Sequence, residues 1–305
     1  MKVGIVILNY NNEKDTIECV KSIFSHCKDN NFVLCIVDNC SESNIVEAVW
    51  RTVSSLGDSV RFKSSDVVDK LHQITYIENC VNTGYANGNN VGLNYLRQFS
   101  DISHYLILNN DILFTMDIIK PLAEYLLEHP DVAVVSPLLY DKFCKVDYEC
   151  ARYEKGFFDI VFRATPLRRL SYIKKKALRN KILIEHPEYL GLPEVDINLP
   201  SGSCMMFTRK TFDDIGFFDP HTFLYFEEDI IWQKLKQLKM RSVMLPSVSC
   251  IHLGARSTSL SSRDVIGRYY SQSLIYYLYN YSGLPSIVIN CIGFWLRLRD
   301  KLINE

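Results

Sequence analysis

Short apolar runs alternate with longer segments of helical periodicity through the first 135 residues of the chain. The apolar runs suit strands buried on both faces, and the segments between them repeat apolar side chains every three to four residues, as amphipathic helices do. This alternation predicts an α/β fold in which a mostly parallel sheet carries helices on both faces. The expected strands cover residues 3–8, 32–37, 73–78 and 105–108, and the expected helices cover 13–26, 44–56, 84–99 and 117–128.

The pattern weakens beyond residue 135, where we place a soft boundary between two halves. Residues 140–198 show no clear period and include a basic stretch. Order returns with an expected strand at 204–208 and an expected helix at 229–238.

Each expected strand of the first half ends in polar side chains. They are Asn9 and Tyr10, Asp38 and Asn39, residues 79–82, and Asn109, Asn110 and Asp111. The carboxyl ends of parallel strands share one edge, where open α/β sheets bind ligands, so we expect these side chains to converge on one crevice. Asp111 would then bind a hard cation or lie beside a phosphate. The alternative is a set of turns and helix caps, which Asn and Asp suit equally.

Glycines recur every four residues at positions 84, 88 and 92, within the segment Asn82-Thr-Gly-Tyr-Ala-Asn-Gly-Asn-Asn-Val-Gly92. This spacing leaves a bare stripe along a helix, which lets a ligand or another backbone approach closely. The N-terminus of that helix also favours a diphosphate. Tight packing of the helix on the sheet is the alternative use of the stripe. Neither G-x-G-x-x-G nor G-x-x-x-x-G-K-[ST] occurs, so a nicotinamide, flavin or P-loop site is not expected.

Three successive acids, Glu227, Glu228 and Asp229, follow an aromatic run and open an amphipathic helix. The helix dipole favours acids in a first turn. Successive helical residues point about 100° apart, so the three cannot all face water. A carboxylate at the edge of an apolar patch has a raised pKa, which suits a general base. His252, near Arg256, is a candidate ligand of a metal or phosphate, although a lone histidine is more often structural.

The composition is that of a globular enzyme. Of the 305 residues, 48% are hydrophobic and 23% charged, and the net charge of −1 gives no reason to expect nucleic-acid binding. The ten cysteines include no C-x-x-C pair, which argues against zinc or a redox dithiol and for reduced, buried thiols in the cytoplasm. Residues 3–8 are too short for a signal peptide, and no apolar run reaches 18 residues.

In this order, the motifs resemble those of the family 2 glycosyltransferases, an inverting group with the GT-A fold, and especially its rhamnosyltransferase-like branch. The matching segments are Val6-Ile-Leu-Asn-Tyr10, Ile36-Val-Asp-Asn-Cys-Ser41, residues 82–92, Leu106-Ile-Leu-Asn-Asn-Asp111, Gly216-Phe-Phe-Asp219 and residues 223–229. The resemblance implies a mostly parallel, Rossmann-like nucleotide-binding sheet flanked by helices. Residues 1–135 would bind the nucleotide sugar, residues 136–260 would form a mixed acceptor-side region with the catalytic base, and residues 261–305 a helical tail.

The resemblance also implies a role for each matching residue. The donor nucleotide and its pocket would be contacted by Leu8, Asn9, Tyr10, Asp38, Asn39, Asn82, Gly84, Tyr85, Gly88, Asn89, Asn109 and Asn110. Asp111 is similar to the last acid of the D-x-D-type motif, which carries Mg2+ or Mn2+ on the donor diphosphate. His252 resembles the late histidine that closes over the diphosphate or the metal. Ser203, within residues 200–203, lies where relatives contact donor or acceptor.

The implied catalytic base is one of the three acids at 227–229. Many relatives read Glu-Asp-x-Asp-Leu where this chain has Glu227-Glu-Asp-Ile-Ile231, so Glu228 matches by position and Asp229 by residue type. We favour Glu228. The implied reaction is inverting, because the base deprotonates an acceptor hydroxyl that attacks the sugar opposite the leaving diphosphate, whose charge the cation at Asp111 neutralises.

Two features bear on a membrane. Residues 163–181 hold eight Lys or Arg residues, which form either a solvated helix face or a contact for anionic lipid headgroups or a lipid-linked pyrophosphate. Six tyrosines between 269 and 281 precede the apolar residues 284–296 and then Arg297, Arg299 and Lys301. This tail is too short to span a bilayer but suits an interfacial anchor.

The expected function is transfer of one sugar from a UDP-, dTDP- or GDP-linked donor to a lipid-linked surface polysaccharide, such as O-antigen or capsule, by a peripheral protein on the inner face of the cell membrane. The aromatic residues Phe217, Phe218, Phe223, Tyr225 and Phe226 either stack on sugars or, as is commoner, form core. A nucleotidyltransferase would need a Gly-rich loop with a basic residue after the first strand, and residues 9–12 offer none. A catalytically inactive module that binds sugar nucleotides or glycans is the other alternative.

Overall fold

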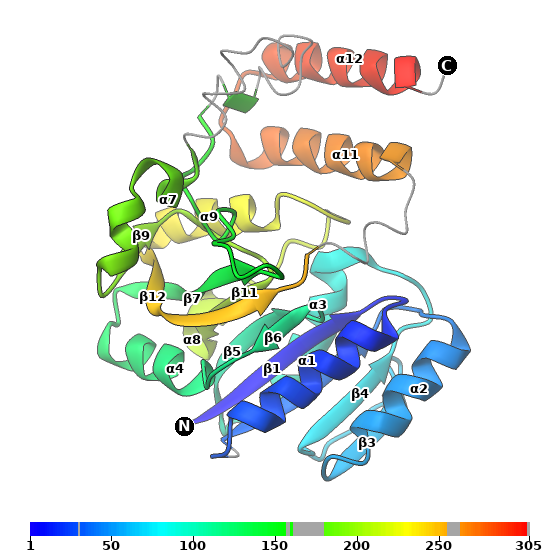
Figure 1. Ribbon diagram of the computed structural model, residues 1–305. Helices are drawn as coiled ribbons and strands as arrows, with labels where there is room; N and C mark the ends of the chain where they lie inside the picture. Colours follow the sequence, from blue (N-terminus) through cyan, green and yellow to red (C-terminus); the bar gives the residue numbers. More distant parts are fainter. Residues whose placement is uncertain (30, 157–158, 161–179, 255–262, 304–305) are drawn as a thin grey trace.

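The computed structural model describes residues 1–29, 31–156, 159–160, 180–254 and 263–303, and it confirms the predicted α/β alternation (Figure 1). The strands are β1 (Lys2–Asn9), β2 (Phe32–Asp38), β3 (Ser59–Lys63), β4 (Ile74–Glu78), β5 (Ile102–Asn109), β6 (Ile112–Phe114), β7 (Val132–Asp141), β8 (Ala151–Arg152), β9 (Val195–Ile197), β10 (Leu199–Pro200), β11 (Cys204–Thr208) and β12 (Arg241–His252). The helices are α1 (Glu13–His26), α2 (Ser43–Val53), α3 (Gly84–Leu96), α4 (Ile119–Glu128), α7 (Ile182–Glu185), the 3-10 helix η3 (Pro187–Gly191), α8 (Arg209–Asp214), α9 (Glu227–Leu238), α11 (Arg263–Tyr281) and α12 (Ser286–Ile303).

The described strands form one large sheet and a short β8–β10 pair. The large sheet runs in the order β3-β4-β2-β1-β5-β11-β7-β12-β6, with β9 paired to β12. The first five of these strands are parallel, and β11 lies antiparallel to β5. The carboxyl ends of β4, β2, β1 and β5 therefore share one edge, as the sequence predicted.

Helices cover both faces of the sheet because the side chains of each strand alternate between two apolar cores. Ile5 and Ile7 of β1 pack in one core with α1, α2 and α4, whereas Val6 packs in the other with α3, α8 and α9. A third apolar cluster joins α11 and α12 to Phe226 and Ile230 at the start of α9. Figure 1 shows α11 and α12 stacked on the α9 side of the molecule, away from α2 and β3.

The structure corrects several predicted elements. The strands β3, β6, β7, β8, β9, β10 and β12 were not predicted, and the helix α9 begins two residues earlier than predicted. The predicted boundary at residue 135 falls inside β7, and β11 of the second half pairs with β5 of the first, so both halves share one sheet. The basic stretch 163–181 lies outside the described residues except for its last two positions, and Arg256 lies outside them as well.

Candidate active site

The polar strand ends converge in a buried hydrogen-bond network. The side-chain nitrogen of Asn9 donates to Asp38 Oδ2 at 2.7 Å, and Asn9 Oδ1 accepts from the Thr16 hydroxyl at 2.8 Å and from the Asn110 amide at 3.3 Å. Tyr76 donates to the same oxygen of Asp38 at 3.0 Å. Asn9 and Asp38 are fully buried, and their polar atoms bind other protein groups. These two predicted donor contacts thus hold the edge of the sheet together.

Asn39 joins the ends of β2 and β4 to the start of α3. Its nitrogen donates to Asn82 Oδ1 at 2.9 Å and to the Gly84 carbonyl at 3.1 Å. Its oxygen accepts from the Asn79 amide and from the backbone and hydroxyl of Thr83, each at 3.1 Å. An amide serves here because it donates and accepts at once. Asn39 therefore fixes the loop that carries the predicted glycine segment.

The three glycines of that segment face protein atoms. A Cβ at Gly88 would lie 2.5 Å from Leu8, and one at Gly92 would lie 2.8 Å from Val6, so both let α3 pack closely on β1. Gly84 has φ +80°, and its Cβ would lie 2.3 Å from the carbonyl oxygen of Phe223. Tight helix–sheet packing, the alternative use of the stripe, thus accounts for the second and third glycines.

A cavity of about 170 Å³ opens at this edge of the sheet. Its lining residues are Leu8, Tyr10, Asn39, Asn82, Gly84, Tyr85, Asn109, Asn110, Phe223, Leu224, Ile266 and Tyr269. Most of them are predicted donor contacts, and Asn89, also predicted, donates to the Tyr85 carbonyl at 2.9 Å. Ile266 and Tyr269 of α11 were not predicted to lie at this site. The ring of Tyr269 stacks on Phe223 with centroids 4.1 Å apart, and the tyrosine-rich tail was the only signal for it.

Asp111, which follows Asn110 in the chain, lies next to His252. Pairing of β6 with β12 sets His252 opposite Ile112, and the backbone N–H of Leu253 donates to the Asp111 carbonyl at 2.9 Å. His252 Nε2 is 3.6 Å from Asp111 Oδ1, and His252 Nδ1 is 3.0 Å from Asp147 Oδ2. The structure thus brings together the two residues that the resemblance assigns to the metal.

Both groups have shifted pKa values. Burial raises the pKa of Asp111, although the charge of His252 opposes the shift. Burial would lower the pKa of His252, but its hydrogen bond to Asp147 and the charges of both aspartates outweigh burial and raise it. The charge of His252 thus favours the ionised form of Asp111, and the charge of Asp111 favours the protonated form of His252.

The donor set at Asp111 fits a divalent cation. Asp111 Oδ1 is buried and has no hydrogen-bond partner among the described residues, which is costly for a carboxylate unless something binds it. No group of three His, Cys, Asp or Glu side chains that could hold a metal occurs within the described ranges. Mg2+ usually takes only one or two protein carboxylates and completes its shell with waters and substrate phosphates. Asp111 with His252 beside it meets that requirement.

The three acids at the start of α9 have different environments. Glu227 is 6% exposed, and burial together with the charge of Glu228 raises its pKa to about 8. Both carboxylate oxygens of Asp229 lie 3.3 Å from Lys155 Nζ, in a buried ion pair. Glu228 is the most accessible of the three and accepts from the Gly202 N–H at 2.9 Å and from Arg152 at 3.3 Å.

The turn at residues 200–203 connects Glu228 to the cavity. Tyr85, which lines the cavity, donates its hydroxyl to the Gly202 carbonyl, and the N–H of the same glycine donates to Glu228. The Ser203 carbonyl accepts from the N–H of Asn109 at 2.8 Å. The hydroxyl of the predicted Ser203 is buried in a hydrogen bond with the Ser201 hydroxyl at 2.7 Å. A substitution at Gly202 would place a Cβ 2.9 Å from the Glu228 carboxylate.

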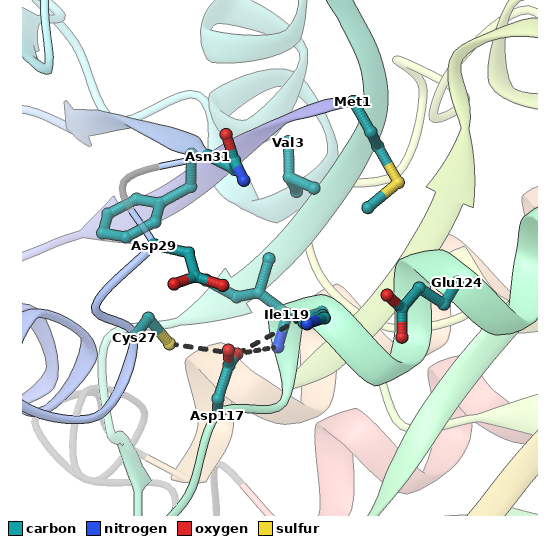
Figure 2. A pocket seen from close by; sticks show the side chains of 10 residues that line it. Met1, Val3, Cys27, Asp29, Asn31, Asp117, Ile119 and Glu124 are labelled. Carbon is teal, nitrogen blue, oxygen red and sulfur yellow. Dashed lines mark hydrogen bonds between the residues drawn. The ribbon is translucent and has the colours of Figure 1, made fainter.

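A second cavity lies at the opposite, amino end of β1 (Figure 2). Cys27 lines this cavity, and its thiol donates to Asp117 Oδ1 at 3.3 Å. The same oxygen accepts from the N–H of Ile119 at 2.9 Å. Asp117 therefore caps the first turn of α4. None of the predicted site residues lines this cavity.

The chain has a GT-A fold, which solved structures share. The chain resembles the mannosyltransferase PcManGT from Pyrobaculum calidifontis in complex with GDP-Man and Mn2+ at a TM-score of 0.55 and 15% identity, covering 96% of this chain and 69% of that one. It resembles S. aureus TarS 1–349 at a TM-score of 0.53 and 15% identity, covering 97% and 70%. GalNAc-T7 with UDP, GalNAc and Mn2+ matches at a TM-score of 0.53 and 13% identity, covering 83% and 44%. At these identities the likeness shows the fold.

The sequence places the chain within a family. Residues 4–216 match the model of Glycosyl transferase family 2, and the chain belongs to that family. It is 27% identical over 227 residues to the low-salt glycan biosynthesis hexosyltransferase Agl10 of Haloferax volcanii, covering 74% of this chain and 59% of that protein. It is 29% identical over 96 residues to an N-acetylglucosaminyl-diphospho-decaprenol L-rhamnosyltransferase of Mycobacterium tuberculosis, covering 32% and 31%. The chain thus spans less than two thirds of the length of these curated relatives.

Proposed function

We propose that this protein is an inverting glycosyltransferase that moves one sugar from a nucleotide-diphosphate donor to a hydroxyl of a lipid-linked glycan. One observation carries the proposal: the buried Asp111 Oδ1, which has no hydrogen-bond partner in the described part of the chain, lies 3.6 Å from His252 beside an amide-lined cavity. Family membership supports the reaction class. The name of the mycobacterial relative, which contains diphospho-decaprenol, supports a lipid-linked acceptor.

The donor would occupy the cavity at the carboxyl edge of the sheet. Asn82, Asn109 and Asn110 offer amides to the sugar nucleotide, and Tyr10 offers an aromatic ring. Asp111, with His252 beside it, would hold Mg2+ or Mn2+, which when bound neutralises charge on the departing nucleoside diphosphate. Two of the structural relatives contain Mn2+, which supports a divalent ion here.

Glu228 would act as the general base. The Gly202 N–H and Arg152 hold its carboxylate in place, whereas Asp229 is committed to its ion pair with Lys155. Glu228 takes the proton of the acceptor hydroxyl, and the oxygen attacks the anomeric carbon opposite the diphosphate. The bond from that carbon to the diphosphate breaks, and the configuration inverts. Glu227, with a pKa of about 8, is mostly protonated at pH 7, so it adds little negative charge beside the base.

The tail would place the enzyme on the cytoplasmic face of a membrane. Ile289, Ile292 and Leu296 of α12 pack against α11. Ile287 (73% exposed) and Phe294 (58% exposed) instead form an apolar stripe on the other side of α12, together with Leu298. A stripe of this kind beside the exposed Arg297 suits insertion among anionic headgroups. No helix in the described ranges is both long and apolar enough to cross a bilayer.

Donor binding tests the proposal directly. Thermal unfolding would be measured with UDP-, GDP- and dTDP-sugars, with and without Mn2+, followed by release of the nucleoside diphosphate. We expect one donor class to raise the melting temperature with Mn2+ and Asp111→Asn to abolish the metal-dependent part. Asp101→Asn, an exposed acid paired with Lys2, serves as the matched control. If no donor gives metal-dependent release of the nucleoside diphosphate, the proposed reaction is wrong and the alternative of a binding module is favoured.

The membrane proposal has its own experiment. Flotation with vesicles containing anionic lipid should recover the full chain, and Phe294→Glu should reduce that recovery severalfold. Phe143→Glu is the matched control, because Phe143 is also an exposed phenylalanine, at 69%, but lies outside the tail. Equal loss from both variants, or no flotation of the unaltered protein at low salt, would contradict a tail-mediated contact.

A further inference from the structure

Two exposed cysteines, Cys40 and Cys80, are in contact in the loops next to the cavity. Four cysteines are exposed, namely Cys40, Cys80, Cys144 and Cys291, so the predicted burial of the thiols is wrong for these four. The Cys40 thiol donates to the backbone carbonyl of Cys80 at 3.3 Å. Cys40 follows Asn39, and Cys80 precedes Asn82 by two residues, and both asparagines line the cavity. The catalytic proposal uses neither thiol.

The sheet register holds these two residues at neighbouring positions. β2 and β4 are parallel, and their last paired residues are Asp38 and Glu78, so Cys40 and Cys80 each stand two residues beyond that pair. The contact continues past the strands, because the N–H of Asn79 donates to the Asp38 carbonyl at 2.9 Å and its side chain donates to Asn39 at 3.1 Å. Adjacent strands lie about 4.8 Å apart, and disulfides join Cα atoms about 4.4–6.8 Å apart. Cys40 has φ +71° and no longer follows the strand, so the contact of its thiol with the Cys80 carbonyl, together with the register, brings the two residues within reach of a disulfide.

We propose that Cys40 and Cys80 form a reversible disulfide that staples the loops after β2 and β4. Both loops bound the cavity, and Asn39 already fixes their arrangement through its hydrogen bonds to Asn79 and Asn82. The new bond joins positions already in contact, so it stabilises this wall of the cavity. It closes a loop of about 40 residues, which restricts the unfolded chain. The inference is independent of the proposed reaction.

The oxidant is a low-molecular-weight disulfide. The thiolate of one cysteine attacks a sulfur of the oxidant, the S–S bond of the oxidant breaks, and one small thiol leaves with a proton. The second protein thiolate then attacks the cysteine sulfur of the mixed disulfide and releases the second small thiol. The protein loses two hydrogens and gains one S–S bond, while the oxidant is reduced to two thiols. A small dithiol reverses the reaction.

Oxidised glutathione is the probe for the test. The full-length protein is incubated with it, alkylated, and measured by intact mass, peptide mapping and thermal unfolding. We expect a loss of two hydrogens, a peptide link between Cys40 and Cys80, and a melting temperature higher by about 5 °C that returns on reduction. Cys40→Ser and Cys80→Ser should each abolish all three results. Cys144→Ser and Cys291→Ser, at the other exposed cysteines, should leave them unchanged.

Two outcomes would overturn the inference. Separate glutathione adducts on Cys40 and Cys80 with no internal link would show that the thiols cannot reach each other. A linked protein whose melting temperature does not rise would show that the bond does not staple the wall. Donor binding is not a readout here, so a failure of the proposed glycosyltransferase reaction would leave this result intact, and the reverse also holds.

Discussion

Glu227→Gln tests the electrostatics of the acid cluster at the start of α9. Glu227 is 6% exposed, and burial together with the charge of Glu228 raises its pKa from 4.5 to about 8. The pKa of Glu227 is higher in the folded protein than in the unfolded chain. Between pH 4.5 and about 8, Glu227 therefore carries a proton in the folded protein that the unfolded chain has lost. The stability from this group is fully present below pH 4.5 and is lost progressively as the pH rises through 8.

The magnitude follows from the two pKa values. They differ by about 3.5, which corresponds to about 5 kcal/mol in total at about 1.4 kcal/mol for each unit. About 2.5 kcal/mol of this falls between pH 5 and pH 7, where the unfolded carboxyl ionises and the buried one does not. For a chain of this length, about 1 kcal/mol shifts the melting temperature by about 1.5 °C, so the expected loss over that range is about 4 °C. Glu227→Gln replaces the carboxyl with a neutral amide, which does not titrate, so this loss of stability between pH 5 and pH 7 should disappear.

Urea and thermal unfolding at pH 5 and pH 7 provide the assay. The variant should lose about 2.5 kcal/mol less than the unaltered protein between these pH values, since all other titrating groups are shared. Glu128→Gln, at an exposed glutamate of α4, is the control and should keep the original pH dependence. If Glu227→Gln also keeps it, Glu227 is not buried as an acid, and the argument for a neutral neighbour beside Glu228 fails with it.

Two further substitutions test single contacts through urea unfolding. Gly84→Ala should lower the free energy of unfolding by about 3 kcal/mol, because the new Cβ meets the Phe223 carbonyl at a positive φ. Gly216→Ala is the control and should lower it by about 1 kcal/mol, because Gly216 has a similar φ of +71° but no atom within 4 Å of the new Cβ. Equal losses would refute the clash. Lys155→Met should cost about 3 kcal/mol because it leaves Asp229 as an unpaired buried charge, and adding Asp229→Asn should recover part of that loss; no recovery would show that the charge is not the cause.

Local pattern predicted the elements whose signals lie within one segment. α1 and β11 have the predicted bounds, because a helical period and a short apolar run between polar residues are local properties. β7 is two short apolar runs separated by Ser136 and Pro137, and neither run is long enough for periodicity to identify a strand. β12 contains Pro246 and shifts register between Leu245 and Ser249, so its sequence does not read as one strand. These two strands depend on partners far away in the chain.

The same limit applies to the site. The parallel-strand rule placed Asn39, Asn82 and Asn109 at one edge, and the structure finds them around one cavity. No local rule could bring Tyr269 to that cavity, since it comes from α11 and is held there by stacking on Phe223. The contacts of Glu228 with the Gly202 turn and with Arg152 are equally long-range. Sequence therefore predicted the edge, and tertiary packing determined which side chains complete it.

The polar side chains of the site are of two kinds: those whose polar atoms have hydrogen-bond partners in the protein and those with a buried atom that has none. Asn9 and Asn39 have polar partners at both ends of their amides, so their substitution should reduce stability before it affects any ligand. Asp111 Oδ1 and Glu227 Oε1 are buried and lack a hydrogen-bond partner among the described residues. A protein keeps such groups against their desolvation cost where they serve a ligand or a charge in the reaction. The position of Asp111, directly after the last polar strand end and 3.6 Å from His252, agrees with the cation site proposed above.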